Sequence, residues 1–171
     1  GAGEVIFDTV NFGSGHVSFF NTKSEILSLK DCELNNHIDL RVQQANLLNL
    51  TDTIVRDIVE IKKLSSTSYI NQVNFSGMRN LGQIYIDWVE NNVYELIKSQ
   101  KEKTNNRQKA DQFRILKENF HNLGQYDDED YAYVEFKRHE LKAKKEEAIA
   151  KNPANAAWVY PRTAFEWFVF D

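Results

Sequence analysis

The sequence predicts a mixed fold: a right-handed parallel β-solenoid of about four coils, followed by an α-helical cap and an αα-hairpin. Two observations predict it. Apolar residues between positions 4 and 88 recur at intervals of about 21 residues, whereas those between positions 89 and 152 follow helical spacing. A single coil of this length cannot bury its inward side chains alone. Stacked coils bury them as continuous columns, so the repeat favours a solenoid.

The repeat is clearest when the segment from Leu29 to Arg41 is compared with the segment from Leu50 to Lys62, because apolar, acidic and basic positions coincide. An antiparallel meander is the alternative fold, but it does not require one register shared by four coils. The polar stretch Lys63–Ser68 is the expected place of an insertion of about four residues in the last coil. Four columns share the register: Val17, Ile38, Val59 and Ile84; Phe19, Leu40, Ile61 and Ile86; Phe7, Leu29, Leu50 and Phe75; and Phe12, Leu34 and Val55.

The residues between paired inward positions are mostly polar, as the two-residue period of a strand requires. They are expected to form a solvated outer face of mixed charge, on which Asp39 stacks on Glu60 and Arg41 on Lys62. His16 and His37 nearly align across two coils and are expected to be neighbours at a corner. Cys32 is the one cysteine, so no intrachain disulfide can form, and the repeat makes it a small core side chain.

Three helices are expected after the solenoid. The first covers Asn91–Gln100, with Asn91 or Asn92 as its N-cap, and Trp88 packs between this cap and the last coil. The second carries Ala110, Phe113, Leu116, Phe120 and Leu123 at helical spacing and ends at Gly124. The third opens with the acids 127–130, which suit a helix N-terminus. Its apolar contacts are expected from Tyr131, Val134, Phe136 and Leu141.

Composition excludes several classes of protein. Hydrophobic residues make up 42% of the chain and the net charge is −4, which argues against a nucleic-acid partner because phosphate binding needs a basic face. The sequence contains no run of about 18 apolar residues, so it does not predict a membrane helix. Both ends resemble cuts from a longer polypeptide. The chain therefore divides into a solenoid at 4–88, a helical cap and hairpin at 89–152, and an apolar segment at 153–171 that is expected to lead to a membrane region.

No residue pattern predicts catalysis, a cofactor or a metal. Gly13-Ser14-Gly15 is a turn and not a nucleophile elbow. The acidic run at 127–130 lacks the glycine and the distal glutamate of a calcium loop. His121 and His139 are close in sequence, but nothing places them on one face with these acids. We therefore predict that the chain is not an enzyme.

Two resemblances extend these inferences. Asn11-Phe12, residues 31–34, Ile38-Asp39-Leu40-Arg41 and residues 47–50 resemble degenerate pentapeptide repeats, whose central Leu or Phe points inward. Residues 82–88 and 113–138 resemble the segment that lies between pentapeptide repeats and a two-helix potassium-channel pore in bacterial membrane proteins. Phe113, Leu116, Phe120, Gly124 and Tyr126 also match the first half of a tetratricopeptide repeat, and the acidic run then departs from it.

The second resemblance implies a function and a location. The chain would be a non-catalytic accessory or regulatory domain of a potassium-channel-like protein, associated with a bacterial inner membrane on a side that the sequence does not fix. Its partner would be a protein or its own pore domain, and a homo-oligomer is compatible with this role. The alternative is a stand-alone interaction or scaffold module; a DNA mimic is disfavoured by the few irregular coils. Candidate partner contacts are Tyr126, Asp127, Asp128, Tyr133 and Trp158.

Overall fold

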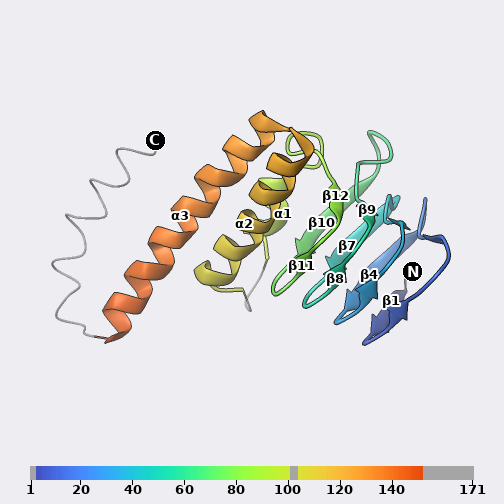
Figure 1. Cartoon of the computed structure of the whole chain (residues 1–171), viewed down its shortest axis with the longest axis horizontal. Coiled ribbons are helices and arrows are strands. Elements are labelled where there is room, and N and C mark those ends of the chain that lie inside the picture. Colours follow the sequence, from blue (N-terminus) through green and yellow to red (C-terminus); the bar gives the residue numbers. More distant parts are fainter. Residues whose placement is uncertain (1–2, 101–103, 152–171) are drawn as a thin grey trace.

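The computed structural model describes residues 3–100 and 104–151, and it confirms a parallel β-solenoid followed by helices (Figure 1). The four coils each contribute one strand to each of three parallel sheets. The first sheet contains β1 (Glu4–Asp8), β4 (Lys23–Lys30), β7 (Gln44–Asn49) and β10 (Tyr69–Asn74). The second contains β2 (Asn11–Phe12), β5 (Glu33–Leu34), β8 (Ile54–Val55) and β11 (Arg79–Asn80). The third contains β3 (Val17–Ser18), β6 (Ile38–Asp39), β9 (Ile58–Glu60) and β12 (Gln83–Tyr85).

The register of the coils is the one that the repeat predicts. Val17 pairs with Ile38, Ile38 with Val59, and Val59 with Ile84. Phe7 pairs with Leu29. The added residues of the last coil lie between β9 and β10, since the pairing is offset there from Gln44 to Tyr69. The insertion therefore falls in the polar stretch 63–68, as expected.

One corner of the solenoid has the same backbone conformation in every coil. Thr9, Asp31, Asp52 and Gly77 all have positive φ, between 54° and 70°. Each of the first three donates its N–H to the carbonyl that precedes the next corner residue, at 2.8–3.1 Å. Aspartate and glycine enter this left-handed region more readily than most residues do. The corner is thus a column of matched turns, in which Thr9 is the residue least suited to its conformation.

The inward columns form a largely apolar core that includes the buried hydroxyl of Thr53, which donates to Leu29 O at 2.6 Å. Leu29, Leu34, Val59 and Ile84 have no exposed surface. Cys32 is fully buried among them, and burial raises the pKa of its thiol. The expectation of a solvated Asp39 is wrong, because Asp39 is only 4% exposed. Arg41 covers it with two bonds from its guanidinium, at 3.0 and 2.8 Å, and this pairing holds the pKa of the Asp39 carboxyl below its ordinary value.

Three helices follow the last coil: α1 (Val93–Lys98), α2 (Asn106–Leu123) and α3 (Tyr126–Lys151). Asn92 is the N-cap of α1, as one of the two expected residues, but its backbone is left-handed and its side chain makes no capping bond. Asn91 instead bonds to Ile61 O and to Asp87 N. Helix α2 begins with a capping box formed by Asn105 and Gln108 and ends at Gly124, whose φ is 70°.

The helices cover the end of the last coil, where β10 and β12 would otherwise expose unpaired backbone. Gln112 Oε1 accepts a hydrogen bond from Phe75 N at 2.9 Å. Asn119 accepts from Ile84 N through Oδ1 and donates to Ile84 O through Nδ2, both at 2.8 Å. Gln100 Nε2 donates to Val73 O and also bonds to Gln112. Two buried amides of α2 and the amide of Gln100, which follows α1, thus bond to the backbone of the last coil as the next strand would.

Trp88 completes this junction. It was expected between α1 and the last coil, and it also packs against the helices α2 and α3 of the hairpin. Its ring lies 6.0 Å from Phe113 and 6.4 Å from Phe120, and it stacks on Tyr131 at 6.0 Å. The core cluster accordingly runs from the second coil through α2 to Ala132 of α3. Of the apolar contacts expected from α3, Phe136 packs against the core cluster and Tyr131 stacks on Trp88. The buried residues of this helix are Ala132, Glu135, His139 and Ala143, and the two polar ones among them were not expected.

Candidate interaction surfaces

The outer face of α3 carries two of the predicted contact residues. Tyr126 is 66% exposed and Tyr133 is 37% exposed. They are seven residues apart, so they lie on the same side of the helix, roughly opposite Asp128 and Ala132 of the packed side. Asp127 is exposed beside Tyr126, and together with Gly124 and Gln125 they border a shallow hollow at the α2–α3 turn.

Asp128 differs from these residues because it has a structural partner. Its Oδ2 accepts a hydrogen bond from Trp88 N at 3.3 Å. Burial raises the pKa of its carboxyl above the ordinary value, with smaller contributions from Asp87 and Asp127 and an opposing one from the bond to Trp88. Asp128 therefore joins the start of α3 to the end of the solenoid. The bond to Trp88 accounts for this side chain, so no contact with a partner protein is needed to explain it.

The other residues singled out from the sequence are His121 and His139, which were weighed as metal ligands, and the predicted contact Trp158. His121 Nδ1 lies 2.9 Å from Glu129 Oε2, and Lys117 Nζ lies 3.4 Å from Glu129 Oε1. His139 is buried elsewhere, so the two histidines do not meet. No group of three or more metal-ligating side chains occurs among the described residues. Trp158 and the whole segment 153–171 lie outside the described residues.

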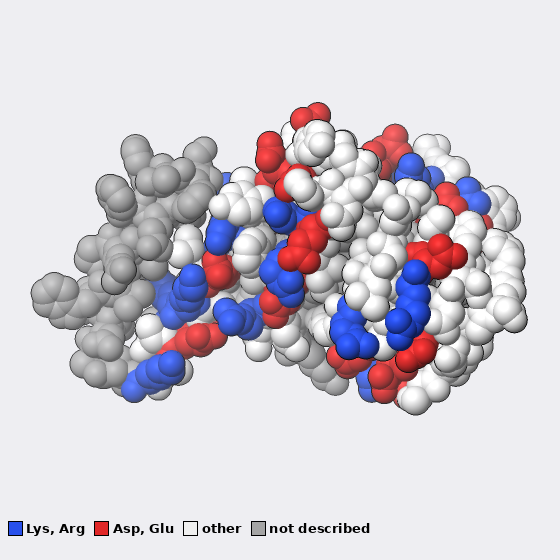
Figure 2. All heavy atoms as spheres, in the orientation of Figure 1, with Lys and Arg blue, Asp and Glu red and all other residues white. Residues whose placement is uncertain are grey.

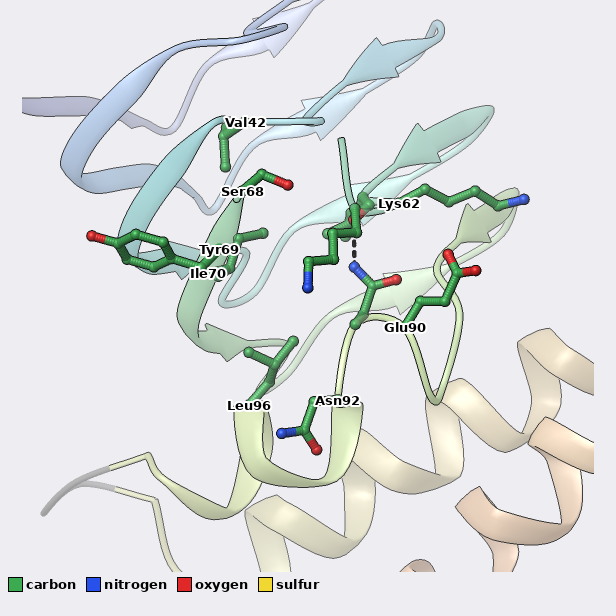
Figure 3. A pocket seen from close by; sticks show the side chains of 11 residues that line it. Val42, Lys62, Ser68, Tyr69, Ile70, Glu90, Asn92 and Leu96 are labelled. Carbon is green, nitrogen blue, oxygen red and sulfur yellow. Dashed lines mark hydrogen bonds between the residues drawn. The ribbon is translucent and has the colours of Figure 1, made fainter. Parts of the chain in front are cut away.

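A second candidate surface is a pocket of about 210 Å³ beside the insertion in the last coil (Figure 3). Its apolar lining comes from Val42, Ile61, Ile70 and Leu96, which belong to the solenoid and to α1. Figure 3 shows Ser68, Ile70 and Leu96 around the hollow, while the Tyr69 ring and the Lys62 chain extend away from it.

Residues of the insertion form one side of this pocket. Ser68 Oγ donates to Ser65 O at 2.8 Å and accepts from Ser65 N at 2.9 Å, and these bonds close the inserted stretch into a compact turn. On the opposite side, Asn91 Nδ2 donates to Ile61 O at 3.0 Å and holds the segment before α1 against the third coil (Figure 3). Glu90 and Asn92 supply polar groups at the rim, and both are exposed.

The size and lining of the pocket limit what it can hold. Pockets for small-molecule ligands usually measure about 300–1,000 Å³, which is larger than this one. The volume suits one side chain of a partner protein, with an apolar stem against Ile70 and Leu96 and a polar end at the rim. Sequence reasoning identified the insertion but not the pocket, because its depth depends on how α1 folds back against β10.

Charge does not single out either surface. Figure 2 shows both signs interspersed over the helices, in agreement with surface pairs such as Arg114 with Glu118 and Lys144 with Glu140. Such exposed pairs stabilise a fold by only about 0–1 kcal/mol each. The aromatic side chains of α3 and the pocket are therefore better markers of a binding surface than the charges.

The comparisons with known proteins yield no relative. No protein-family model matches the chain, no curated protein matches it, and no solved structure matches it. Among the described residues, no helix has the length and apolar character needed to cross a membrane.

Proposed function

We propose that the chain is a non-catalytic protein-binding module, in which the solenoid and the hairpin serve as one rigid frame. The buried amide junction carries this proposal. Gln112 and Asn119 are 0% and 2% exposed, and each bonds both to the backbone of the last coil and to neighbouring side chains. A hairpin held in this way keeps a fixed orientation, so a partner can contact both parts without paying to order them.

The exposed tyrosines of α3 are the proposed contact. Tyrosine supplies a large contact area at a low cost in conformational entropy, and it is enriched where proteins meet. The Tyr126 ring meets His121 of α2 edge-on at 6.5 Å, and the Tyr133 ring lies 5.8 Å from Lys137 Nζ, yet both tyrosines remain exposed. The pocket beside the insertion would accept a single side chain of the same or another partner.

A more specific role is that of an accessory or regulatory domain of a bacterial potassium-channel-like membrane protein. The resemblance of residues 82–88 and 113–138 to the segment before such pores supports it. These two segments contribute Trp88, Phe113, Asn119 and Asp128, which are among the residues that join the hairpin to the solenoid. A rigid junction of this kind would transmit a movement of the solenoid to whatever follows the hairpin.

Photo-crosslinking tests the binding role. A benzophenone amino acid replaces Tyr126 or Tyr133 in cells that express the native gene, and Glu118, which is exposed on α2, takes it as the matched control. We expect both tyrosine positions to capture the same polypeptide and the Glu118 position to capture none of it. Equal capture from all three positions, or no capture from any, would refute the hairpin as a contact surface.

The channel role has a separate test in the parent open reading frame and in the captured product. Two membrane spans that flank a filter segment, encoded in the same frame, would support it. So would a crosslink from Tyr126 to the protein's own membrane region. A stop codon directly after Asp171, together with capture of an unrelated soluble protein, would reject the channel role and leave the binding module.

A further inference from the structure

The pocket beside the insertion interrupts the regular packing of one solenoid corner. Val42 lies at this corner, between β6 and β7, and is only 3% exposed. The residue that follows it in the next coil is Lys63 by the strand pairing before the insertion and Thr67 by the pairing after it. Both are polar and exposed. The inward column therefore stops at Val42, and the pocket lies where its next apolar side chain would stand.

Aliphatic side chains from separate parts of the fold form the walls of the pocket. They are Val42, Ile61, Ile70 and Leu96. Ile61 is 1% exposed and Leu96, on α1, is 5% exposed, so these walls belong to the packed core. Core side chains are held in place by their neighbours, and the hollow is therefore formed before anything binds in it.

The polar groups of the inner lining already have partners within the chain. The Ser68 hydroxyl bonds to both the N–H and the carbonyl of Ser65. The Asn91 amide donates to Ile61 O and accepts from Asp87 N. Since these groups are satisfied, they do not attract a polar ligand into the hollow. What the hollow can bind is an apolar group.

The volume of the pocket matches one large apolar side chain. It measures about 210 Å³. An engineered apolar cavity of roughly 150 Å³ in another protein binds benzene, so a phenyl ring or a leucine side chain fits here. An alanine side chain would leave most of the hollow empty.

The mouth of the pocket is basic on the side of the insertion. Lys63 is exposed and lines the pocket. Lys62, next to it, extends away from the hollow but adds to the positive charge on this side (Figure 3). The Glu90 carboxylate points away from Ile70 (Figure 3). A carboxylate beside a bound apolar group therefore meets Lys63, whereas a cation at the same place would be repelled.

We propose that this pocket binds a short linear segment of a partner protein, whose leucine or phenylalanine side chain enters the hollow and whose neighbouring aspartate or glutamate pairs with Lys63. This inference rests on the proposed function, since it names the chemistry that a protein-binding module recognises at its second surface. The bound side chain takes the place that follows Val42 in the inward column. Burial of that side chain supplies most of the affinity, and the charge selects the neighbouring residue.

Methyl NMR of the full chain tests the pocket directly, because all four wall residues carry methyl groups. The probes are three short peptides with blocked ends: a leucine between aspartates, a leucine between lysines, and an alanine between aspartates. We expect the first to shift the methyl signals of Ile61, Ile70 and Leu96 with a Kd of about 1 mM, as one buried side chain allows. The second should bind about fivefold more weakly, and the third tenfold or more.

A charge reversal tests the contact with the carboxylate. In Lys63→Glu the preference should invert, so that the leucine between lysines binds more tightly than the leucine between aspartates. Lys30→Glu is the matched control, since Lys30 is exposed on β4, lies outside the pocket lining and changes the net charge by the same amount. It should keep the original preference. Circular dichroism verifies that both variants are folded.

Three results would overturn the proposal. The wall methyl signals could stay unmoved up to about 10 mM of the first peptide, ten times the expected Kd. The alanine peptide could bind as tightly as the leucine one, or the two lysine variants could change the preference equally. Each result rejects the pocket but leaves capture at Tyr126 and Tyr133, and with it the binding module, standing. Conversely, the expected titration without that capture keeps the pocket and rejects the hairpin contact.

Discussion

At the scale of single residues, buried polar side chains decide how the helices attach. Gln112 is fully buried and uses both ends of its amide, accepting from Phe75 N and Gln100 and donating to Ser76 Oγ. His139 is another such residue. It is 6% exposed, its Nδ1 lies 2.7 Å from Asn106 Oδ1, and its ring stacks on Phe113 at 5.5 Å. Gln112 and His139 are tolerated in the interior because each has hydrogen-bond partners.

The surroundings of His139 make the fold sensitive to acid. Burial lowers its pKa to about 4, and the positive charges of Lys142 and Lys109 add to this effect. In the unfolded chain the histidine has its ordinary pKa near 6.5. Between these two values the unfolded state binds the proton and the folded state does not, so stability falls as the pH is lowered. The contribution of His139 is fully present above pH 6.5 and is lost as the pH approaches 4.

We expect the free energy of unfolding to decrease between pH 7 and pH 4 by on the order of 3 kcal/mol more in the native protein than in His139→Gln. Urea unfolding followed by circular dichroism at several pH values measures this difference. Asn122→Gln is the control, since Asn122 is exposed on α2 and carries no titratable group, and it should follow the native pH profile. Parallel profiles for the native protein and His139→Gln would show that the buried histidine does not govern acid stability.

At the scale of elements, the coils follow from sequence more completely than the helices do. Inward apolar columns fix the strand register, because a slip by one residue would turn every inward side chain outward. The corners were not predicted, although Asp31, Asp52 and Gly77 occupy equivalent places in the repeat. Their residue types are those that a left-handed turn favours, so this signal was present in the sequence.

The shared corner predicts opposite effects for two substitutions. Thr9 is β-branched and has a φ of 59°, a conformation that asparagine adopts at lower cost, so Thr9→Asn should raise the free energy of unfolding by about 1 kcal/mol. Gly77→Ala should lower it by more than that. Gly77 has a φ of 70°, and an added methyl group would lie 2.0 Å from Asp52 Oδ1.

Urea unfolding of the two variants, compared with Gly13→Ala, measures these effects. Gly13 has no neighbouring atom within 4 Å of an added Cβ, so the control should change stability little. If Thr9→Asn destabilised the protein, the left-handed corner would not be a source of strain at this coil.

At the scale of the whole molecule, the sequence predicted the helices that follow the solenoid but not how they attach to it. The periodicity of α2 predicted its end at Gly124, and its apolar face correctly contained Phe113 and Phe120, whereas its start at Asn106 was not predicted. It did not predict that Gln112 and Asn119 belong to the same buried face. In the sequence, an amide side chain at an apolar position looks like an exposed residue. Only the structure shows the strand edge to which it bonds. For the same reason, the stripe of Glu135 and His139 on α3 was not predicted.

These amides imply that the solenoid and the hairpin unfold together. One core cluster spans both, and Asn119 bonds to Ile84 of the last coil and to the Asn80 side chain. Hydrogen exchange in increasing urea should therefore give one opening free energy for the amides of α2 and of β7. Asn119→Ala leaves Ile84 N and O unpaired in the interior, and each such group costs about 1–3 kcal/mol.

In Asn119→Ala we expect α2 and α3 to open at lower urea than β4 and β7, so that one transition becomes two. Asn46→Ala is the control, because Asn46 makes similar side-chain bonds, to Glu25 and Asn71, at the solenoid surface and away from the junction. It should leave a single transition. If Asn119→Ala also kept one transition with a uniformly lower opening free energy, apolar packing around Trp88 would suffice to couple the two parts. The amides would then serve only to satisfy the backbone of the last coil.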